Sequence, residues 1–80
     1  MATTAMHTLD ELTPGQQAVV KHVGGSGPIR RRLMDMGLVR GVVVETLKTA
    51  PLGDPVEYRL RGYHLSLRRS EARMVDVEFV

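Results

Sequence analysis

"PIRRRLMDMGL", residues 28–38, carries the strongest helix signal in this sequence. Pro28 suits the first helical position, where its missing N–H would have no partner in any case. Ile29, Leu33 and Met36 are spaced at i, i+4 and i+7, so they form a single apolar stripe along one face. We therefore predict a helix that buries this stripe against a core.

The helix is predicted to end at a glycine. Gly37 follows the last helical turn and suits the left-handed conformation that closes many helices. Leu38 would then contact Leu33, the apolar pair that accompanies a Schellman ending. We expect all three residues to be structural, because the left-handed conformation costs a bulky residue roughly 1–2 kcal/mol.

The rest of the chain is typical of short strands. Five segments are rich in β-branched or alternating apolar residues: 16–23, 42–50, 56–60, 64–68 and 75–80. Gly41 lies at the start of the second. With a helix inserted at about residues 28–36, they predict a mainly β fold, a small and strongly bent barrel. The pattern fits SH3-like and OB-like barrels equally. One or two further helical turns are expected, one capped by Thr8 with Glu11 and one by Ser70.

"PLGDP", between the second and third predicted strands, holds more turn chemistry than a minimal hairpin needs. Pro51 and Gly53 suit positions i+1 and i+3 of a type I turn. Asp54 precedes Pro55, so its backbone is held extended and its carboxylate can cap nearby amides. So stiff a loop either fixes the strand crossing or presents Leu52 and Asp54 to a partner. We assign the prolines and the glycine a structural role and Leu52 the binding role.

Length and composition indicate one small domain. In a chain of 80 residues we expect a loose N-terminal tail over residues 1–7 and one domain over residues 8–80 with a thin core. The absence of cysteine excludes disulfides, thiolate metal sites and a cysteine nucleophile. The N-terminus has no apolar signal segment, and no apolar run is long enough to span a bilayer. We expect a cytoplasmic protein that is not inserted in a membrane.

No constellation of residues predicts catalysis or a cofactor. The histidines lack metal-ligand spacing. His22 and His64 lie on predicted strands that could meet across a sheet, so they are weak candidates should a transition metal bind. The net charge is +2, and the aromatic residues are Tyr58, Tyr63 and Phe79, with Phe79 in the inward set of the last strand. This is too few exposed rings to favour nucleic-acid binding.

Arginines fill the first turn of the predicted helix, where the helix dipole prefers anions. Arg30, Arg31 and Met34 are predicted to project outward. Arg32 lies near the boundary of the buried face. A cationic, partly apolar patch of this kind suits an acidic groove on a partner. The alternative is a solvated face on which Arg31 pairs with Asp35, worth only about 0.2–0.5 kcal/mol.

Several ordered segments carry a resemblance to a known family. They are an opening "L..L.PGQ", then "RRLMDMGLVRG", then "TAPLGDPVEYRLRGYHLSLRRSEARMVDV", and they span Leu9 to Val77. Together they resemble FeoA, the small cytosolic accessory protein of bacterial ferrous iron uptake. The resemblance implies an SH3-like barrel with an inserted helix. It also implies a partner, FeoB, the membrane ferrous iron transporter with a cytosolic GTP-binding domain.

On this resemblance we expect a non-catalytic protein that binds the cytosolic part of FeoB and modulates iron uptake, with weak self-association. One alternative is a module related to the C-terminal domains of metal-dependent repressors, which follow a winged-helix and a dimerisation domain. The chain starts at its own methionine and has neither, which favours the stand-alone protein. A small RNA-binding barrel is the other alternative, and retention on heparin at physiological salt would distinguish it.

Overall fold

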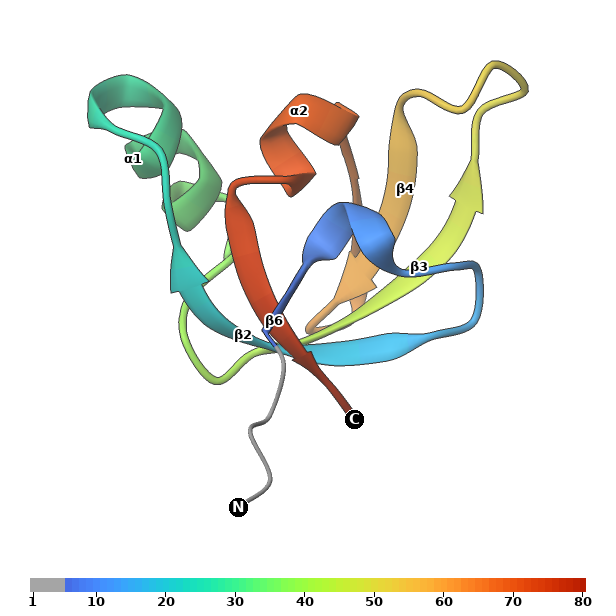
Figure 1. Ribbon diagram of the computed structural model, residues 1–80, viewed down its shortest axis with the longest axis horizontal. Helices are drawn as coiled ribbons and strands as arrows, with labels where there is room; N and C mark the ends of the chain where they lie inside the picture. Colours follow the sequence, from blue (N-terminus) through green and yellow to red (C-terminus); the bar gives the residue numbers. More distant parts are fainter. Residues whose placement is uncertain (1–5) are drawn as a thin grey trace.

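The computed structural model describes residues 6–80, which form one antiparallel sheet with short helices beside it (Figure 1). The strands are β1 (His7–Thr8), β2 (Gln17–Val23), β3 (Val43–Thr49), β4 (Val56–Leu60), β5 (Tyr63–Leu67) and β6 (Val75–Phe79). The helical segments are the 3-10 turn η1 (Leu9–Glu11) and the helices α1 (Gly27–Asp35) and α2 (Arg69–Ala72). The predicted mainly β fold with an inserted helix is confirmed.

The sheet is strongly bent and stays open. Its strand order is β1-β6-β2-β3-β4-β5, so β1 and β5 are its edges. The register shifts between Val20 and His22 in β2, and again between Thr46 and Lys48 in β3. Such irregularities bend the bulged strand and increase its twist, and Figure 1 shows β2 and β3 curving beneath the rest of the molecule.

The sequence predicted five strands, and the structure adds a sixth. His7 and Thr8 form β1, which pairs with β6. The predicted tail of residues 1–7 therefore wrongly includes His7, which belongs to β1. Residues 1–5 of that tail lie outside the described residues. Phe79 is 39% exposed rather than inward, and its ring stacks on the His7 ring with centroids 4.1 Å apart. Two residues are too few to show a strand pattern in the sequence.

The core is one cluster of aliphatic side chains around Tyr58. It follows from strand alternation, because every second residue of β4 is buried, as are Val75 and Val77 of β6. Thr46 is the buried polar exception among the described residues. The Tyr58 hydroxyl donates to the Leu9 carbonyl oxygen at 3.5 Å, which ties β4 to η1.

Helix α1 covers the core with its second half. Leu33 is fully buried, but Ile29, predicted to face the core, is 41% exposed. Figure 1 shows the reason: α1 lies at one end of the molecule, and its first turn extends past the sheet. Ser26 is the N-cap, which puts Pro28 at the second helical position rather than the first.

The end of α1 has the predicted Schellman geometry. Gly37 has φ +101°. The Leu38 N–H donates to the Leu33 carbonyl at 3.2 Å, and the Gly37 N–H donates to the Met34 carbonyl at 3.0 Å. These are the two hydrogen bonds that define the motif.

The elements are divided between two sides of the molecule. In Figure 1, α1, α2 and the β3–β4 loop lie along the upper side, with α2 between the other two. The C-terminal end of β6 leads to the lower side, next to β1, with which β6 pairs.

Candidate functional site

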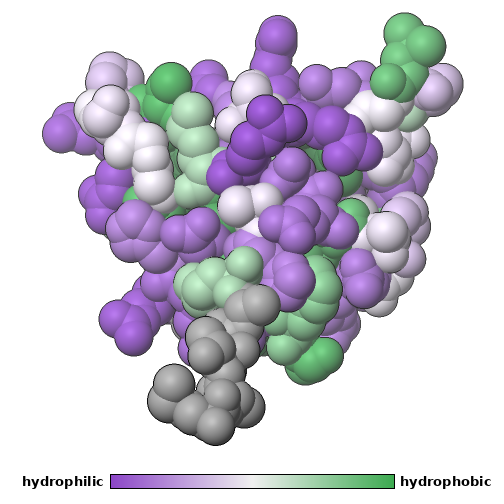
Figure 2. All heavy atoms as spheres, in the orientation of Figure 1, coloured by the Kyte–Doolittle hydropathy of each residue, from purple (hydrophilic) through white to green (hydrophobic). Residues whose placement is uncertain are grey.

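The β3–β4 loop projects from the upper side and ends in an apolar tip. The Gly53 N–H donates to the Ala50 carbonyl at 2.7 Å, and the Ala50 N–H donates to the Pro55 carbonyl at 3.0 Å. Pro51 and Gly53 thus occupy the predicted turn positions. Leu52, at the tip, is 97% exposed. Figure 2 shows an apolar projection above this loop, at the upper right.

Asp54 contributes to the fold rather than extending freely into solvent. Its Oδ1 accepts a hydrogen bond from the Arg69 backbone N–H at 3.0 Å and so caps the first turn of α2. The sequence predicted Ser70 as that cap, which is wrong: the N-cap position belongs to Arg68. The Arg68 N–H donates to Glu71 Oε1 at 2.9 Å, which completes the turn.

The Arg69 side chain links three segments. Its Nε donates to the Gly53 carbonyl in the loop, and its Nη1 donates to the Asp10 carbonyl in η1 at 3.3 Å. Sequence reasoning did not single out Arg69, because its partners are 16 and 59 residues away. Its place in the "LSLRRSEA" segment was the available signal.

The outer face of α1 is a second candidate surface. Arg30, Arg31 and Met34 are all exposed, as predicted. However, the Arg30 Nε donates to the Val23 carbonyl at 3.0 Å, and the Arg32 guanidinium pairs with the Glu71 carboxylate of α2. Contacts within the fold therefore involve two of the three arginines, Arg30 and Arg32, which the sequence did not predict.

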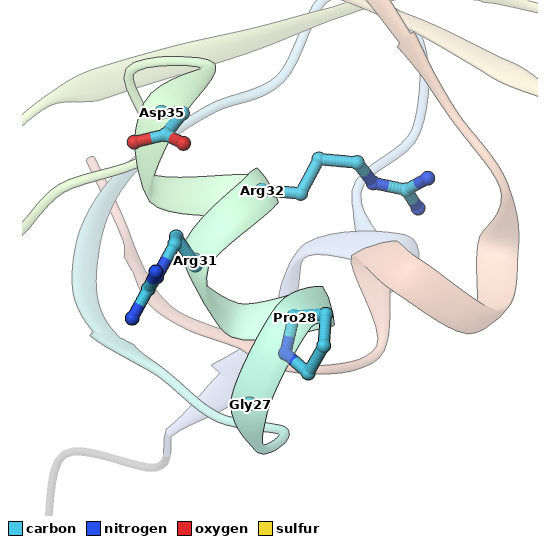
Figure 3. Close-up of a pocket in the computed structure, with 5 residues that line it drawn as sticks. All are labelled: Gly27, Pro28, Arg31, Arg32 and Asp35. Atoms are coloured by element: carbon cyan, nitrogen blue, oxygen red, sulfur yellow. The ribbon is translucent and has the colours of Figure 1, made fainter.

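Arg31 differs from Arg30 and Arg32 because, within residues 6–80, its side chain makes neither a hydrogen bond nor an ion pair. The pair with Asp35, which the alternative of a solvated face included, is absent among the seven salt bridges of that part of the chain. Both side chains border an open depression of about 370 Å³ together with Gly27, Pro28 and Arg32. Figure 3 shows Arg31 pointing away from Arg32.

Two ionisable groups have shifted pKa values. Hydrogen bonds from His7, from the Thr8 N–H and from the Thr8 hydroxyl lower the pKa of Glu11 to about 2. Burial raises the pKa of Tyr58, so its phenol stays protonated and keeps its hydrogen bond to Leu9. Both groups thus support the fold, since the hydrogen bonds that each makes join neighbouring segments of the chain.

The structure does not bring the two candidate metal-binding histidines together. His22 is on β2 and His64 on β5, and β3 and β4 lie between these strands. The His22 Nδ1 is 3.4 Å from the Asp76 Oδ2. Over residues 6–80 no group of three histidine, cysteine or acidic side chains is close enough to share a metal ion.

Comparison with known proteins identifies the family. A family model for the FeoA domain matches residues 7–79. The chain belongs to the FeoA family. The Fe(2+) transport protein A/Fe(2+) transporter FeoB fusion protein of Porphyromonas gingivalis (strain ATCC BAA-308 / W83) is 44% identical over 72 residues. These residues cover 90% of this chain but 8% of the fusion protein. The FeoA family is thereby linked to ferrous iron transport.

Solved FeoA structures have the same fold. The FeoA protein of Chlorobium tepidum superposes with a TM-score of 0.86 at 44% identity, covering 92% of this chain and 70% of that one. The FeoA of Stenotrophomonas maltophilia, solved in complex with zinc and described as a prokaryotic SH3 domain protein, gives 0.80 at 34% identity, covering 90% and 89%. The SH3-like prediction is confirmed, and the OB-like alternative is not.

The repressor likeness extends to the fold alone. A manganese-dependent transcriptional repressor superposes with a TM-score of 0.86 at 15% identity, over 98% of this chain and 38% of that one. FeoA membership is the more specific finding. In residues 6–80 of this FeoA-family chain, no helix is long and apolar enough to cross a membrane.

Proposed function

We propose that this FeoA-family protein is a non-catalytic, cytoplasmic accessory protein that binds the cytosolic part of FeoB and modulates ferrous iron uptake. The fusion protein carries this proposal, because there a domain 44% identical to this chain is part of one polypeptide with the transporter. Joining two domains in one chain keeps them at high local concentration. We infer from this covalent link that the FeoA domain of this chain also associates with FeoB.

The upper side of the molecule is the proposed contact surface. It offers the cationic outer face of α1, with Arg31 and Met34, and the apolar tip of the β3–β4 loop, with Leu52. Apolar anchors that fill a partner's pocket dominate binding energy, whereas charges at the rim orient the encounter. Arg30 and Asp54 border the same surface, although each is also used within the fold.

The decisive experiment measures ferrous iron transport in cells. A strain lacking the chain's own gene, with FeoB as its sole ferrous route, is assayed for Fe(II) uptake and complemented with this protein. We expect uptake to fall in the deletion strain and to recover on complementation. Normal uptake in the deletion strain would refute the proposal. Retention of the purified protein on heparin at physiological salt would instead support the RNA-binding alternative.

Variants locate the surface. Leu52→Ser removes the apolar tip, and Val80→Ser is the matched control, because Val80 is 77% exposed on the opposite side. We expect Leu52→Ser to raise the Kd for the cytosolic part of FeoB by about tenfold or more, and Val80→Ser to leave it unchanged. Calorimetry on the purified proteins gives both values.

Reversing the charge of Arg31 tests the cationic face of α1. Arg31→Glu is expected to leave the melting temperature unchanged or slightly raised, because it removes a cation from the helix N-terminus. It should nonetheless weaken the complex several-fold, mainly through slower association. Arg40→Glu, at an exposed position in the connection between α1 and β3, makes the same charge change elsewhere. Equal effects of the two variants would show that net charge, not this face, matters.

A further inference from the structure

Among the described residues, the hydrogen bonds that join the β3–β4 loop to other elements all involve one residue of α2, Arg69. Within the loop, two backbone hydrogen bonds close the turn, from Gly53 to Ala50 and from Ala50 to Pro55. Outward, Arg69 supplies both connections. Its backbone N–H donates to the Asp54 carboxylate at 3.0 Å, and its Nε donates to the Gly53 carbonyl. The tip residue Leu52 is adjacent to the second of these contacts.

Arg69 is unusual among the cations of this chain. It is half-buried and, across the described residues, forms no side-chain ion pair. Its guanidinium donates to backbone carbonyls in two segments, Gly53 in the loop and Asp10 in η1. Binding two acceptors at fixed angles requires the planar fork of arginine, which lysine lacks. The side chain thus acts as a brace between η1 and the loop.

A brace of this kind matters for binding because the loop tip is exposed. A free loop would sample many conformations, and ordering it in a complex costs conformational entropy. A loop already held in the bound shape avoids that cost and gains affinity without any new contact. The brace does not serve to bury Leu52, because the Leu52 side chain is 97% exposed.

We propose that Arg69 is a positioning residue that locks the β3–β4 loop, so that Leu52 is presented as a preformed apolar anchor for a pocket on the transporter. The partner in this statement rests on the proposed function, whereas the lock itself rests on the contacts of Arg69. Arg69 touches the loop backbone and need not touch the partner.

Arg69→Gln is the test, with Arg68→Gln as the matched control, because Arg68 is the exposed neighbour with no side-chain hydrogen bond among the described contacts. The first readout is hydrogen exchange of the Gly53 amide, measured by NMR on the free protein. We expect exchange to quicken about tenfold or more in Arg69→Gln and to stay unchanged in Arg68→Gln. Arg69→Lys should lie closer to Arg69→Gln than to the parent.

The second readout is affinity for the cytosolic part of FeoB. We expect Arg69→Gln to raise the Kd about tenfold. In a Leu52→Ser background it should raise the Kd little further, because the loop then has no apolar anchor whose position could affect binding. A merely structural role would lower affinity equally in both backgrounds. If Arg69→Gln does not fold, Asp54→Ala opens the loop from its other side, and the same two readouts apply.

The outcomes separate the two proposals. Unchanged Gly53 exchange in both Arg69→Gln and Asp54→Ala would overturn the lock, whatever the affinities. Faster exchange with an unchanged Kd would overturn the role of the lock in docking. If the parent protein itself does not bind the cytosolic part of FeoB, the proposed function is refuted. The hydrogen-exchange data then still test whether Arg69 locks the loop.

Discussion

Gly37 lies just after α1, close to Tyr63 of β5 and Leu60 of β4. The Tyr63 hydroxyl donates to the Met36 carbonyl directly beside it. A Cβ atom at position 37 would overlap this hydroxyl, and it would lie 3.4 Å from Leu60 Cδ1. Position 37 therefore requires glycine for two reasons. Its φ is positive, and there is no room for a Cβ atom beside the Tyr63 hydroxyl.

Gly37→Ala should lower the free energy of unfolding by about 2–3 kcal/mol, through the left-handed conformation and the displaced hydrogen bond. Gly41→Ala is the control, because Gly41 has φ +93° but no atom within 4 Å of a new Cβ. It should cost only the backbone part, about 1–2 kcal/mol. Tyr63→Phe should reduce the cost of Gly37→Ala, because it removes the overlapping atom. If chemical denaturation gave the same cost for Gly37→Ala with and without Tyr63→Phe, this account would be wrong.

Thr46 holds a buried hydroxyl without a partner. Its side chain is fully buried on β3, and its Oγ1 makes no hydrogen bond to the described residues. Thr46→Val replaces that hydroxyl with a methyl group of similar size, so it should raise the free energy of unfolding by about 1 kcal/mol. Val44→Thr, two residues earlier in the same strand, is the reverse control and should destabilise. A loss of stability in Thr46→Val would mean that the hydroxyl has a partner.

At the scale of elements, one carboxylate links β1 to η1. Glu11 accepts from the His7 ring at 2.9 Å and from the Thr8 N–H at 2.9 Å, and so joins the strand to the turn that follows it. Thr8 and Glu11 have the capping-box spacing that the sequence showed.

This carboxylate gives the segment a pH dependence. The folded state lowers the pKa of Glu11 from 4.5 to about 2. A depressed pKa adds stability above the unfolded value, and that stability is lost as the pH falls from about 4.5 towards 2. Glu11→Gln should reduce the loss of stability between about pH 4.5 and pH 2. Asp35→Asn should not, because Asp35 is an exposed carboxylate without an ion pair in the described chain. Melting temperatures between pH 5 and about pH 2 provide the comparison.

The elements also show what local sequence can predict. The ending of α1 and the turn at Pro51 depend on residues within one turn of each other, and both were predictable. Contacts between distant segments were not. The Asp54 carboxylate caps α2 from 15 residues away, so Ser70 was the wrong choice. Ile29 was wrongly predicted to lie in the core. Helical periodicity shows on which face of a helix a residue lies, but it does not show whether the sheet extends far enough to cover that residue.

The candidate site was predicted in part for the same reason. Leu52 was accessible to sequence reasoning, because an apolar residue at the centre of a tight turn has little to pack against. The contacts of Arg30 and Arg32 were not predicted, because their partners, the Val23 carbonyl and Glu71, come from other elements. Only the folded chain distinguishes Arg31 from them.

At the scale of the molecule, the arrangement of the sheet bears on iron. His22 and His64 are held on strands that are not neighbours, and Fe(II) favours several histidine and carboxylate ligands around one ion. We expect calorimetry on tag-free protein to show no stoichiometric Fe(II) binding at micromolar affinity. A micromolar site abolished by His22→Ala or His64→Ala would contradict this prediction.

The pairing of β1 with β6 has a consequence for how the domain can be tethered. Because these strands are hydrogen-bonded neighbours, both ends of the domain emerge at the side opposite α1, α2 and the β3–β4 loop (Figure 1). A linker or an affinity tag on either end therefore leaves the upper side unobstructed. A short flexible linker to a second domain would hold that side at an effective concentration of about millimolar. A contact too weak to persist between separate molecules would then be occupied most of the time.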